Sequence, residues 1–115
     1  MRRRYVGYIR VAHEDDSAVE LQKSKIEYYA KKNNIQIDYY YIDNGYSGIN
    51  LNRPQLKQLL RDVKSRKVTN EIIYTDNNRI SRNKFDFSKI VRAISKSNVK
   101  LVSMIEEENV MTSMM

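Results

Sequence analysis

Short apolar runs alternate with segments of helical periodicity along this chain of 115 residues, and that alternation constrains the fold most. The apolar runs are expected to be strands at Tyr5–Arg10, Gln36–Ile42, Glu71–Tyr74 and Val99–Met104. Strands that alternate with helices across short loops are typical of a parallel sheet covered on both faces. We therefore predict a single α/β domain over residues 1–115, with a mostly parallel sheet of about four or five strands.

Three segments carry the helical pattern. The first begins at Ser17, a suitable N-cap with Glu20 at the capping-box position, and runs to about Lys32. Pro54 suits the first turn of the second helix, which reaches about Ser65, and Asn83 is expected to cap the third. The apolar positions expected to face the sheet are Ala18, Leu21, Ile26, Tyr29 and Ala30, then Leu56, Leu59, Leu60 and Val63, then Phe85, Ile90, Val91 and Ile94.

Charge and composition narrow the choice of partner. The chain has 21 Lys and Arg residues against 14 Asp and Glu, a net charge of +7, which favours polyanions and nucleic acid first. A basic surface that serves only solubility would explain the balance equally well, so the positions of the arginines decide. With no cysteine and one histidine, His13, we expect neither a metal site nor a cofactor. The chain has no apolar run that could span a bilayer, and we expect a cytoplasmic protein.

Polar segments follow the predicted strands, so their side chains should meet at one rim of the sheet. They are Arg10 at the end of the first strand, then Asp43, Ser47 and Arg53, then Asp76, Asn78, Arg79, Ser81 and Arg82, with Gln22 leaning in from the first helix. Converging guanidinium groups predict a phosphate site, because their forked donors match phosphate oxygens. Alternatively, Arg79 and Arg82 are solvated or pair with Asp76 and Asp86.

Two other groups of residues on this rim and sheet have structural explanations. Gly45 and Gly48 are expected to serve a turn that needs positive φ, and Asp43 could equally cap that loop. Tyrosines near the sheet could stack on bases, but we expect them to pack in the core. These are Tyr28, Tyr29, Tyr39, Tyr40 and Tyr41.

Several stretches together resemble the catalytic domain of serine recombinases, the resolvase/invertase family. They are Tyr8–Val11 followed by Gln22, Asp43–Gly48 continuing through Pro54, Ile72–Asn83, and Asn98–Ser103. The resemblance covers almost the whole chain, in the family's order and spacing. It implies a flavodoxin-like three-layer fold and a role in site-specific DNA recombination or integration by mobile elements. In this family a serine attacks a DNA phosphate and forms a phosphoserine link to the 5′ end.

The resemblance also implies roles for individual residues. Arg10, Arg53, Arg79 and Arg82 would bind the DNA phosphate, and Arg10, Arg79 and Arg82 would be catalytic as well. Gln22, Asp43, Ser47 and Asn78 would support the site, which contains no metal or cofactor. The implied partner is DNA, held through its backbone.

The chain departs from the family pattern in three places. Ala12 stands where the family has its nucleophilic serine, and a methyl group cannot attack phosphorus. Ser17 begins a helix and is better explained as its cap. Asn78 stands where the family usually has an acidic residue. The chain also ends where the family's long helix would begin, so we expect the oligomerisation helix and the C-terminal DNA-binding domain to be absent, and a monomer or weak dimer.

The favoured hypothesis is a serine-recombinase-like domain that binds the DNA backbone weakly and does not cleave it. It could be an excised domain whose serine was replaced. It could also be a natural degenerate homologue that acts as a protein-interaction or inhibitory module. A small nuclease or phosphatase that uses water as nucleophile has thin support, from Asp43 and Asp76 alone.

Overall fold

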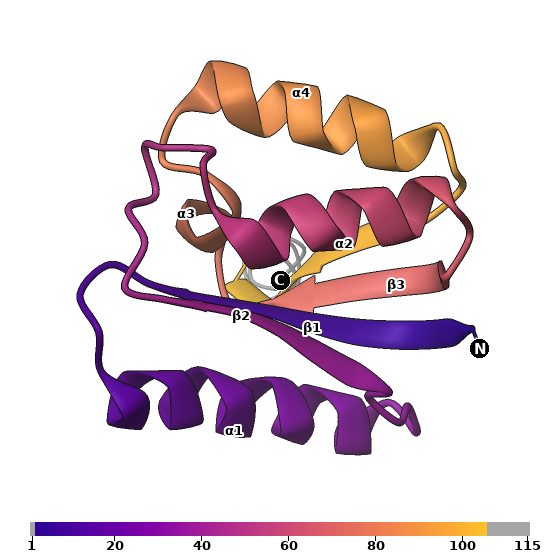
Figure 1. The fold of residues 1–115 in the computed structure, drawn as a ribbon. Coiled ribbons are helices and arrows are strands. Elements are labelled where there is room, and N and C mark those ends of the chain that lie inside the picture. Colours follow the sequence, from indigo (N-terminus) through magenta and orange to yellow (C-terminus); the bar gives the residue numbers. More distant parts are fainter. Residues whose placement is uncertain (1, 106–115) are drawn as a thin grey trace, which may run out of the picture.

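The computed structural model describes residues 2–105 and contains one parallel sheet between two helical layers (Figure 1). In chain order the elements are β1 (Arg3–Val11), α1 (Asp16–Lys32), β2 (Tyr39–Asn44), α2 (Pro54–Lys64), β3 (Val68–Tyr74), α3 (Asn77–Ile80), α4 (Lys84–Ser95) and β4 (Lys100–Ser103). Helix α1 covers one face of the sheet, and α2 and α4 lie over the other (Figure 1). The predicted fold class, an α/β domain with a parallel sheet, is confirmed.

The strand order is β2-β1-β3-β4, and every neighbouring pair is parallel. In the sheet, β2, which follows β1 in the chain, lies on one side of β1. β4, which follows β3 in the chain, lies on the opposite side of β3. The connections therefore diverge at the carboxyl ends of β1 and β3. In open α/β sheets this switch point is where ligands usually bind.

The side chains of β1 alternate between two apolar cores. Val6 and Tyr8 belong to the core beneath α2 and α4, whereas Ile9 and Val11 belong to the core beneath α1. Because successive side chains of a strand point to opposite faces, Arg10 lies on the same face as Tyr8. Arg10 therefore points toward the loops that precede α2 and follow β3.

The start of α1 differs from the prediction. Asp15, not Ser17, is the N-cap residue, and its carboxylate accepts hydrogen bonds from the main-chain N–H groups of Ser17 and Ala18. The Ser17 hydroxyl donates to the same carboxylate at 2.7 Å. A carboxylate can accept several hydrogen bonds at once, so Asp15 takes the role that a sequence pattern alone assigned to the serine. The predicted cap of α4, Asn83, is confirmed.

Strand boundaries also differ from the predictions. β2 begins at Tyr39 rather than Gln36, because the carboxylate of Asp38 accepts from the main-chain N–H groups of Arg4 and Tyr5 where a ladder would otherwise form. β1 and β3 each begin earlier than expected, at Arg3 and Val68, where the two strands pair.

Some predicted core positions are exposed. Leu21 is 58% exposed, because it lies beside the buried face of α1 and not on it. The buried face consists of Val19, Gln22, Ile26 and Ala30. Phe85 is 69% exposed, because the buried stripe of α4 passes through Ile90 and Ile94.

The prediction that the tyrosines pack in the core holds only in part. Tyr41 is fully buried, and Tyr29 and Tyr40 pack at the edge of the core beneath α1. Tyr28 and Tyr39 are exposed. Burial of a sheet tyrosine therefore depends on which face and which strand end it occupies.

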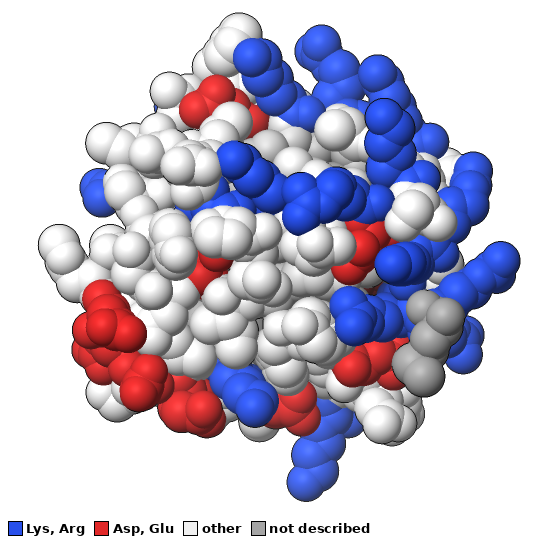
Figure 2. All heavy atoms as spheres, viewed as in Figure 1, with Lys and Arg blue, Asp and Glu red and all other residues white. Residues whose placement is uncertain are grey.

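Charge is distributed unevenly over the surface (Figure 2). Acidic side chains gather near the start of α1, and many Lys and Arg side chains lie on the side where β1 begins and α2 ends (Figure 2). Within residues 2–105 no helix has the length and apolar character needed to cross a membrane.

Candidate functional site

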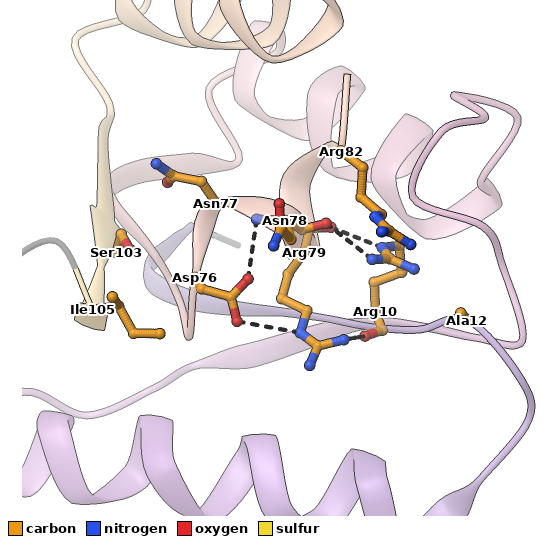
Figure 3. A pocket seen from close by; sticks show the side chains of 9 residues that line it. All are labelled: Arg10, Ala12, Asp76, Asn77, Asn78, Arg79, Arg82, Ser103 and Ile105. Carbon is orange, nitrogen blue, oxygen red and sulfur yellow. Dashed lines mark hydrogen bonds and ion pairs between the residues drawn. The ribbon is translucent and has the colours of Figure 1, made fainter. Parts of the chain in front are cut away.

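A cleft of about 680 Å³ opens at the carboxyl ends of β1 and β3, at the switch point of the sheet (Figure 3). It draws residues from the end of β1, from the segment after β3 and from the end of β4. The lining residues are Arg10, Ala12, Asp76, Asn77, Asn78, Arg79, Arg82, Ser103 and Ile105. Arg10, Arg79 and Arg82, predicted from the sequence, are therefore brought together in one cleft.

Arg10 ties two loops to the end of β1. Its guanidinium group donates to the main-chain carbonyls of Tyr46 at 3.0 Å, Asn78 at 2.9 Å and Arg79 at 3.3 Å. These bonds use three of the five N–H donors of the side chain, which is 2% exposed. Arg10 thus fixes the shape of the rim and keeps a minority of its donors for a ligand.

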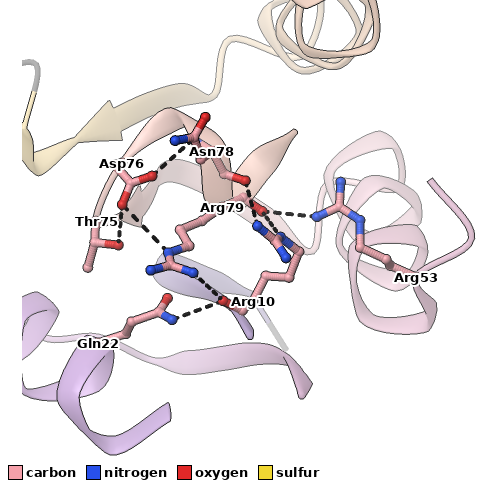
Figure 4. Close-up of polar contacts among 7 residues, drawn as sticks. All are labelled: Arg10, Gln22, Arg53, Thr75, Asp76, Asn78 and Arg79. Carbon is pink, nitrogen blue, oxygen red and sulfur yellow. Dashed lines mark hydrogen bonds and ion pairs between the residues drawn. The ribbon is translucent and has the colours of Figure 1, made fainter. Parts of the chain in front are cut away.

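Arg53 is fully buried and does not line the cleft. It donates to the carbonyls of Asn50, Arg79 and Ile80 and to the hydroxyl of Tyr8. Four of its five donors are therefore satisfied inside the protein. The structure places Arg53 behind the cleft, where it joins the loop before α2 to the segment after β3 (Figure 4).

The hydroxyl of Tyr8 connects Arg53 to Asp43. It accepts from Arg53 at 3.1 Å and donates to the carboxylate of Asp43 at 2.8 Å. Asp43 is fully buried and also accepts from the main-chain N–H groups of Gln55 and Leu56, both at 2.9 Å. Asp43 therefore caps the start of α2, which has no side-chain cap from its own N-cap residue. This is a capping role, but for the helix rather than for the loop.

Arg79 crosses the cleft from α3 toward β1 (Figure 4). Its guanidinium group donates to the carbonyl of Arg10 at 3.2 Å and lies 3.6 Å from the carboxylate of Asp76. The amide of Gln22 donates to the same carbonyl of Arg10 at 2.9 Å. The Oε1 atom of Gln22 is buried with no hydrogen-bond partner among the described residues. Gln22 thus reaches the rim as predicted, through the main chain of Arg10.

Arg82 is the exposed member of the arginine group and lies beside the guanidinium of Arg10 (Figure 3). Its main-chain N–H donates to the carbonyl of Gly48 at 2.9 Å. A Cβ atom on Gly48 would lie 2.7 Å from both Nη2 of Arg10 and Cγ of Arg82. Gly48 is therefore needed for close approach and not for positive φ, whereas Gly45, with φ of +94°, matches the prediction.

The remaining predicted residues divide between the cleft and its surroundings. Ala12 is exposed and lines the cleft next to Arg10, as does the side chain of Asn78 (Figure 3). Ser47 lies outside the lining, and its hydroxyl accepts from the main-chain N–H of Ile49 within a turn. Asp76 and Ser103 complete the cleft. Asp76 can be recognised in the sequence as a rim residue by its place after the third strand, whereas no sequence pattern singles out Ser103.

The electrostatics of the cleft favour an anion. Three guanidinium groups line it, and among the described lining residues the one carboxylate is that of Asp76, which leaves an excess of two positive charges. Burial, followed by repulsion from the guanidinium groups of Arg53 and Arg79, lowers the pKa of Arg10. An anion in the cleft would relieve that repulsion. Within the described part of the chain, no group of three His, Cys, Asp or Glu side chains could hold a metal ion.

Comparisons with known proteins agree on one family. The sequence profile "Resolvase, N terminal domain" matches residues 5–115. The C-terminal catalytic domain of ISC1926 TnpA, an IS607-like serine recombinase, is 27% identical with a TM-score of 0.79, over 88% of this chain and 67% of that one. A resolvase family site-specific recombinase from Streptococcus pneumoniae is 25% identical with a TM-score of 0.75, over 90% and 73%.

The N-terminal catalytic domain of TP901-1 integrase shares the fold, with a TM-score of 0.82 at 23% identity over 90% of this chain and 79% of that one. No curated protein is significantly similar to the chain in sequence. This chain therefore shares the fold of serine recombinase catalytic domains.

Proposed function

Because the chain belongs to the resolvase N-terminal domain family, we propose that its cleft binds the phosphate backbone of DNA and, with alanine at position 12, does so without cleaving it. The family and the fold support a part in site-specific recombination. The observation that carries the finer proposal is the cleft itself, where three guanidinium groups face one carboxylate beside the methyl group of Ala12.

A phosphodiester suits this cleft in charge and in hydrogen bonding. It carries one negative charge and presents acceptor oxygens only, which guanidinium groups can bind in pairs. Arg79 and Arg82 have more unused donors than Arg10, whose bonds to three carbonyls are internal. We assign phosphate binding chiefly to Arg79 and Arg82, assisted by Arg10, with Arg53, Asp43 and Gln22 holding the rim in shape.

Strand cleavage by this family's route needs an oxygen nucleophile beside the bound phosphate. Ala12 supplies none, Ser47 lies outside the cleft lining, and Ser17 is occupied at the start of α1. Ser103 lines the cleft but is 4% exposed, which limits access to a phosphate. The arrangement supports binding without formation of a covalent protein–DNA link.

Titration of a duplex of about 30 bp with the Arg82→Gln variant tests the binding site. Loss of one phosphate contact should weaken binding and reduce the slope of log K against log salt by about 1. The control is Lys89→Gln, which removes an exposed charge from the middle of α4. Equal effects of the two substitutions would contradict a site in the cleft.

Denaturing gels with end-labelled DNA test the chemistry. The unmodified chain should give no retarded adduct band, and Ala12→Ser alone should stay below detection. Ala12→Ser with Asn78→Asp, fused to an oligomerisation helix and a DNA-binding domain, should give trace 5′-phosphoserine adducts. An adduct from the unmodified chain that disappears in Ser103→Ala would show that Ser103 is the nucleophile and would overturn the proposal.

A protein-interaction or inhibitory module is the second candidate. It is favoured by the number of arginine donors spent internally, since Arg53 alone uses four of five. Such a module would show no DNA binding even at low salt. A steep decline of binding with rising salt would instead support phosphate contacts.

A further inference from the structure

A second basic surface lies at the opposite edge of the sheet from the cleft, where the strands begin. Two segments of the chain, residues 2–4 and 61–67, carry seven of its 21 Lys and Arg residues. We name this surface the amino-edge basic face. Its members are Arg2, Arg3, Arg4, Arg61, Lys64, Arg66 and Lys67.

The fold brings these two segments together. Arg3 pairs with Val68 at the start of the sheet, and its main-chain N–H donates to the carbonyl of Lys67 at 2.6 Å. α2 ends at Lys64, directly before this pairing. Figure 2 shows basic side chains gathered on this side of the molecule. Because β1 runs from this edge to the cleft, the two basic surfaces lie at opposite ends of the same strand.

Apart from Arg3 and Lys67, which lie near the carboxylate of Asp62, the described members of this face have no ion pair with an acidic side chain. All members except Arg3 are exposed. Asp62 is buried and occupied, since its carboxylate accepts from the hydroxyl of Tyr41 at 2.6 Å and from Gln58 at 2.8 Å, and lies 3.6 Å from Arg3. Asp38, at the same edge, accepts from the main-chain N–H groups that begin β1. The face therefore retains a strong excess of positive charge.

The turn that ends α2 places the side chain of Arg66 on the surface of this face. Arg66 has φ of +65°, in the left-handed region. The other described residues with positive φ are Asn34, Gly45 and Asn98, types that tolerate this conformation. This conformation ends α2 in a Schellman motif, in which the main-chain N–H of Arg66 donates to the carbonyl of Val63 at 3.1 Å and that of Lys67 donates to the carbonyl of Asp62 at 2.7 Å. Its side chain extends from an exposed turn.

The face is polar rather than apolar, which indicates the class of partner. Most of the exposed large apolar side chains lie on α1, α4, the loop before α2 and the segment after β4; they are Leu21, Tyr28, Tyr46, Ile49, Phe85 and Ile105. Tyr39 is the exposed aromatic residue at this edge. Tyr39 is covered by the guanidinium of Arg3, 3.7 Å from its ring centroid. Protein interfaces centre on apolar and aromatic residues, whereas protein–DNA interfaces are polar and positively charged.

We propose that the amino-edge basic face binds the phosphate backbone of a duplex DNA segment, separately from the segment bound in the cleft. Binding is independent of sequence, because exposed cations on flexible side chains contact phosphates and read no bases. The two sites face opposite ends of the domain, so one chain can hold two duplexes. DNA binding by the face does not depend on the cleft being a phosphate site, whereas the two-duplex complex rests on the proposed function of the cleft.

The test compares two variants that each lose two positive charges. Arg66→Gln with Lys67→Gln alters the face, and Lys89→Gln with Arg92→Gln alters the outer surface of α4. Affinity for a duplex of about 30 bp is measured between about 50 and 200 mM salt. The first pair should weaken binding and reduce the slope of log K against log salt by about 1.8, while the α4 pair leaves the slope unchanged. Equal slopes for both pairs would overturn the proposal.

A second measurement detects the two-duplex complex. Duplexes labelled with donor and acceptor dyes should show energy transfer with the unmodified chain and lose it with the Arg66 and Lys67 pair. Arg82→Gln should also abolish energy transfer, although its amino-edge basic face still binds one duplex. A cleft that does not bind DNA and a face that does not bind DNA therefore give different results. Transfer that survives in the Arg66 and Lys67 pair would exclude the face as a DNA site.

Two further controls address folding and the class of polyanion. Arg66→Gly should raise Tm, because it relieves the left-handed backbone, and should still weaken DNA binding. A simultaneous loss of Tm and binding would mean that Arg66 serves the fold. Competition by oligoglutamate as effective as competition by DNA of equal charge would assign the face to an acidic protein instead.

Discussion

The hydroxyl of Tyr8 joins two charged side chains that no water reaches. It donates to Asp43 and accepts from Arg53, and all three residues are fully buried. Burial raises the pKa of Tyr8 well above its usual range, so the group stays protonated and can donate at any pH the protein withstands. Through this hydroxyl, the residue that caps α2 is coupled to the arginine that holds the loop behind the cleft.

Tyr8→Phe should lower the free energy of unfolding by about 2 kcal/mol, because hydrogen bonds to two buried charged groups are lost. The measurement is urea denaturation at neutral pH. Tyr5→Phe, on the same strand but only half-buried, is the matched control and should change the value by less than about 0.5 kcal/mol. A loss equal to that of the control would show that Asp43 and Arg53 do not depend on this hydroxyl.

At the scale of elements, α1 positions the cleft from the opposite face of the sheet. The main-chain N–H of its N-cap residue, Asp15, donates to the side-chain oxygen of Asn44 at the end of β2. From the second turn, Gln22 supports the carbonyl of Arg10. Correct capping of α1 therefore fixes both the loop that contains Ala12 and the support behind Arg10.

Asp15→Ala should lower Tm at neutral pH more than Ser17→Ala does, because the carboxylate accepts from two main-chain N–H groups. Hydrogen bonds from the Ser17 hydroxyl and from the main chain lower the pKa of Asp15. A carboxyl with a lowered pKa stabilises the fold above its unfolded pKa of about 3.9, and the effect is lost as pH falls through the folded value. The Tm difference between Asp15→Ala and the unmodified chain should therefore shrink below about pH 4. A larger loss for Ser17→Ala would restore the serine as the cap.

For the whole molecule, positive charge is concentrated at both ends of the sheet, and the net charge is +7. The cleft holds an excess of two charges, and the amino-edge basic face holds seven cationic side chains. Like charges at this density repel one another in the folded state and attract polyanions. Salt should therefore act in opposite directions on folding and on DNA binding.

Raising salt from about 20 to about 200 mM should raise Tm, because screening shortens the range of this repulsion to about 10 Å or less. The variant with Arg66→Gln and Lys67→Gln should show a smaller rise, since part of the repulsion is already removed. Differential scanning fluorimetry without DNA measures both. A Tm that falls with salt would mean that attractive ion pairs dominate the surface instead.

The alternation of apolar runs and helical periods determined the fold class, because strand and helix periods follow from which side chains must be buried. It also located the rim, because polar segments after parallel strands meet at one edge. Strand and helix ends were less predictable. The cap at Asp15 and the start of β2 depend on which carboxylate captures a main-chain N–H group, and several candidates stand close together in the sequence.

Only the tertiary structure shows which arginines are held by internal hydrogen bonds and which can bind a ligand. Arg10, Arg53, Arg79 and Arg82 look equivalent as residues that follow strands, yet Arg53 is fully buried and Arg82 is exposed. The difference arises because carbonyl groups from two segments, the loop before α2 and the segment after β3, converge on Arg10 and Arg53, whose donors satisfy those carbonyls. Sequence determines which groups carry charge, but long-range packing decides which charges face inward and which remain for a ligand.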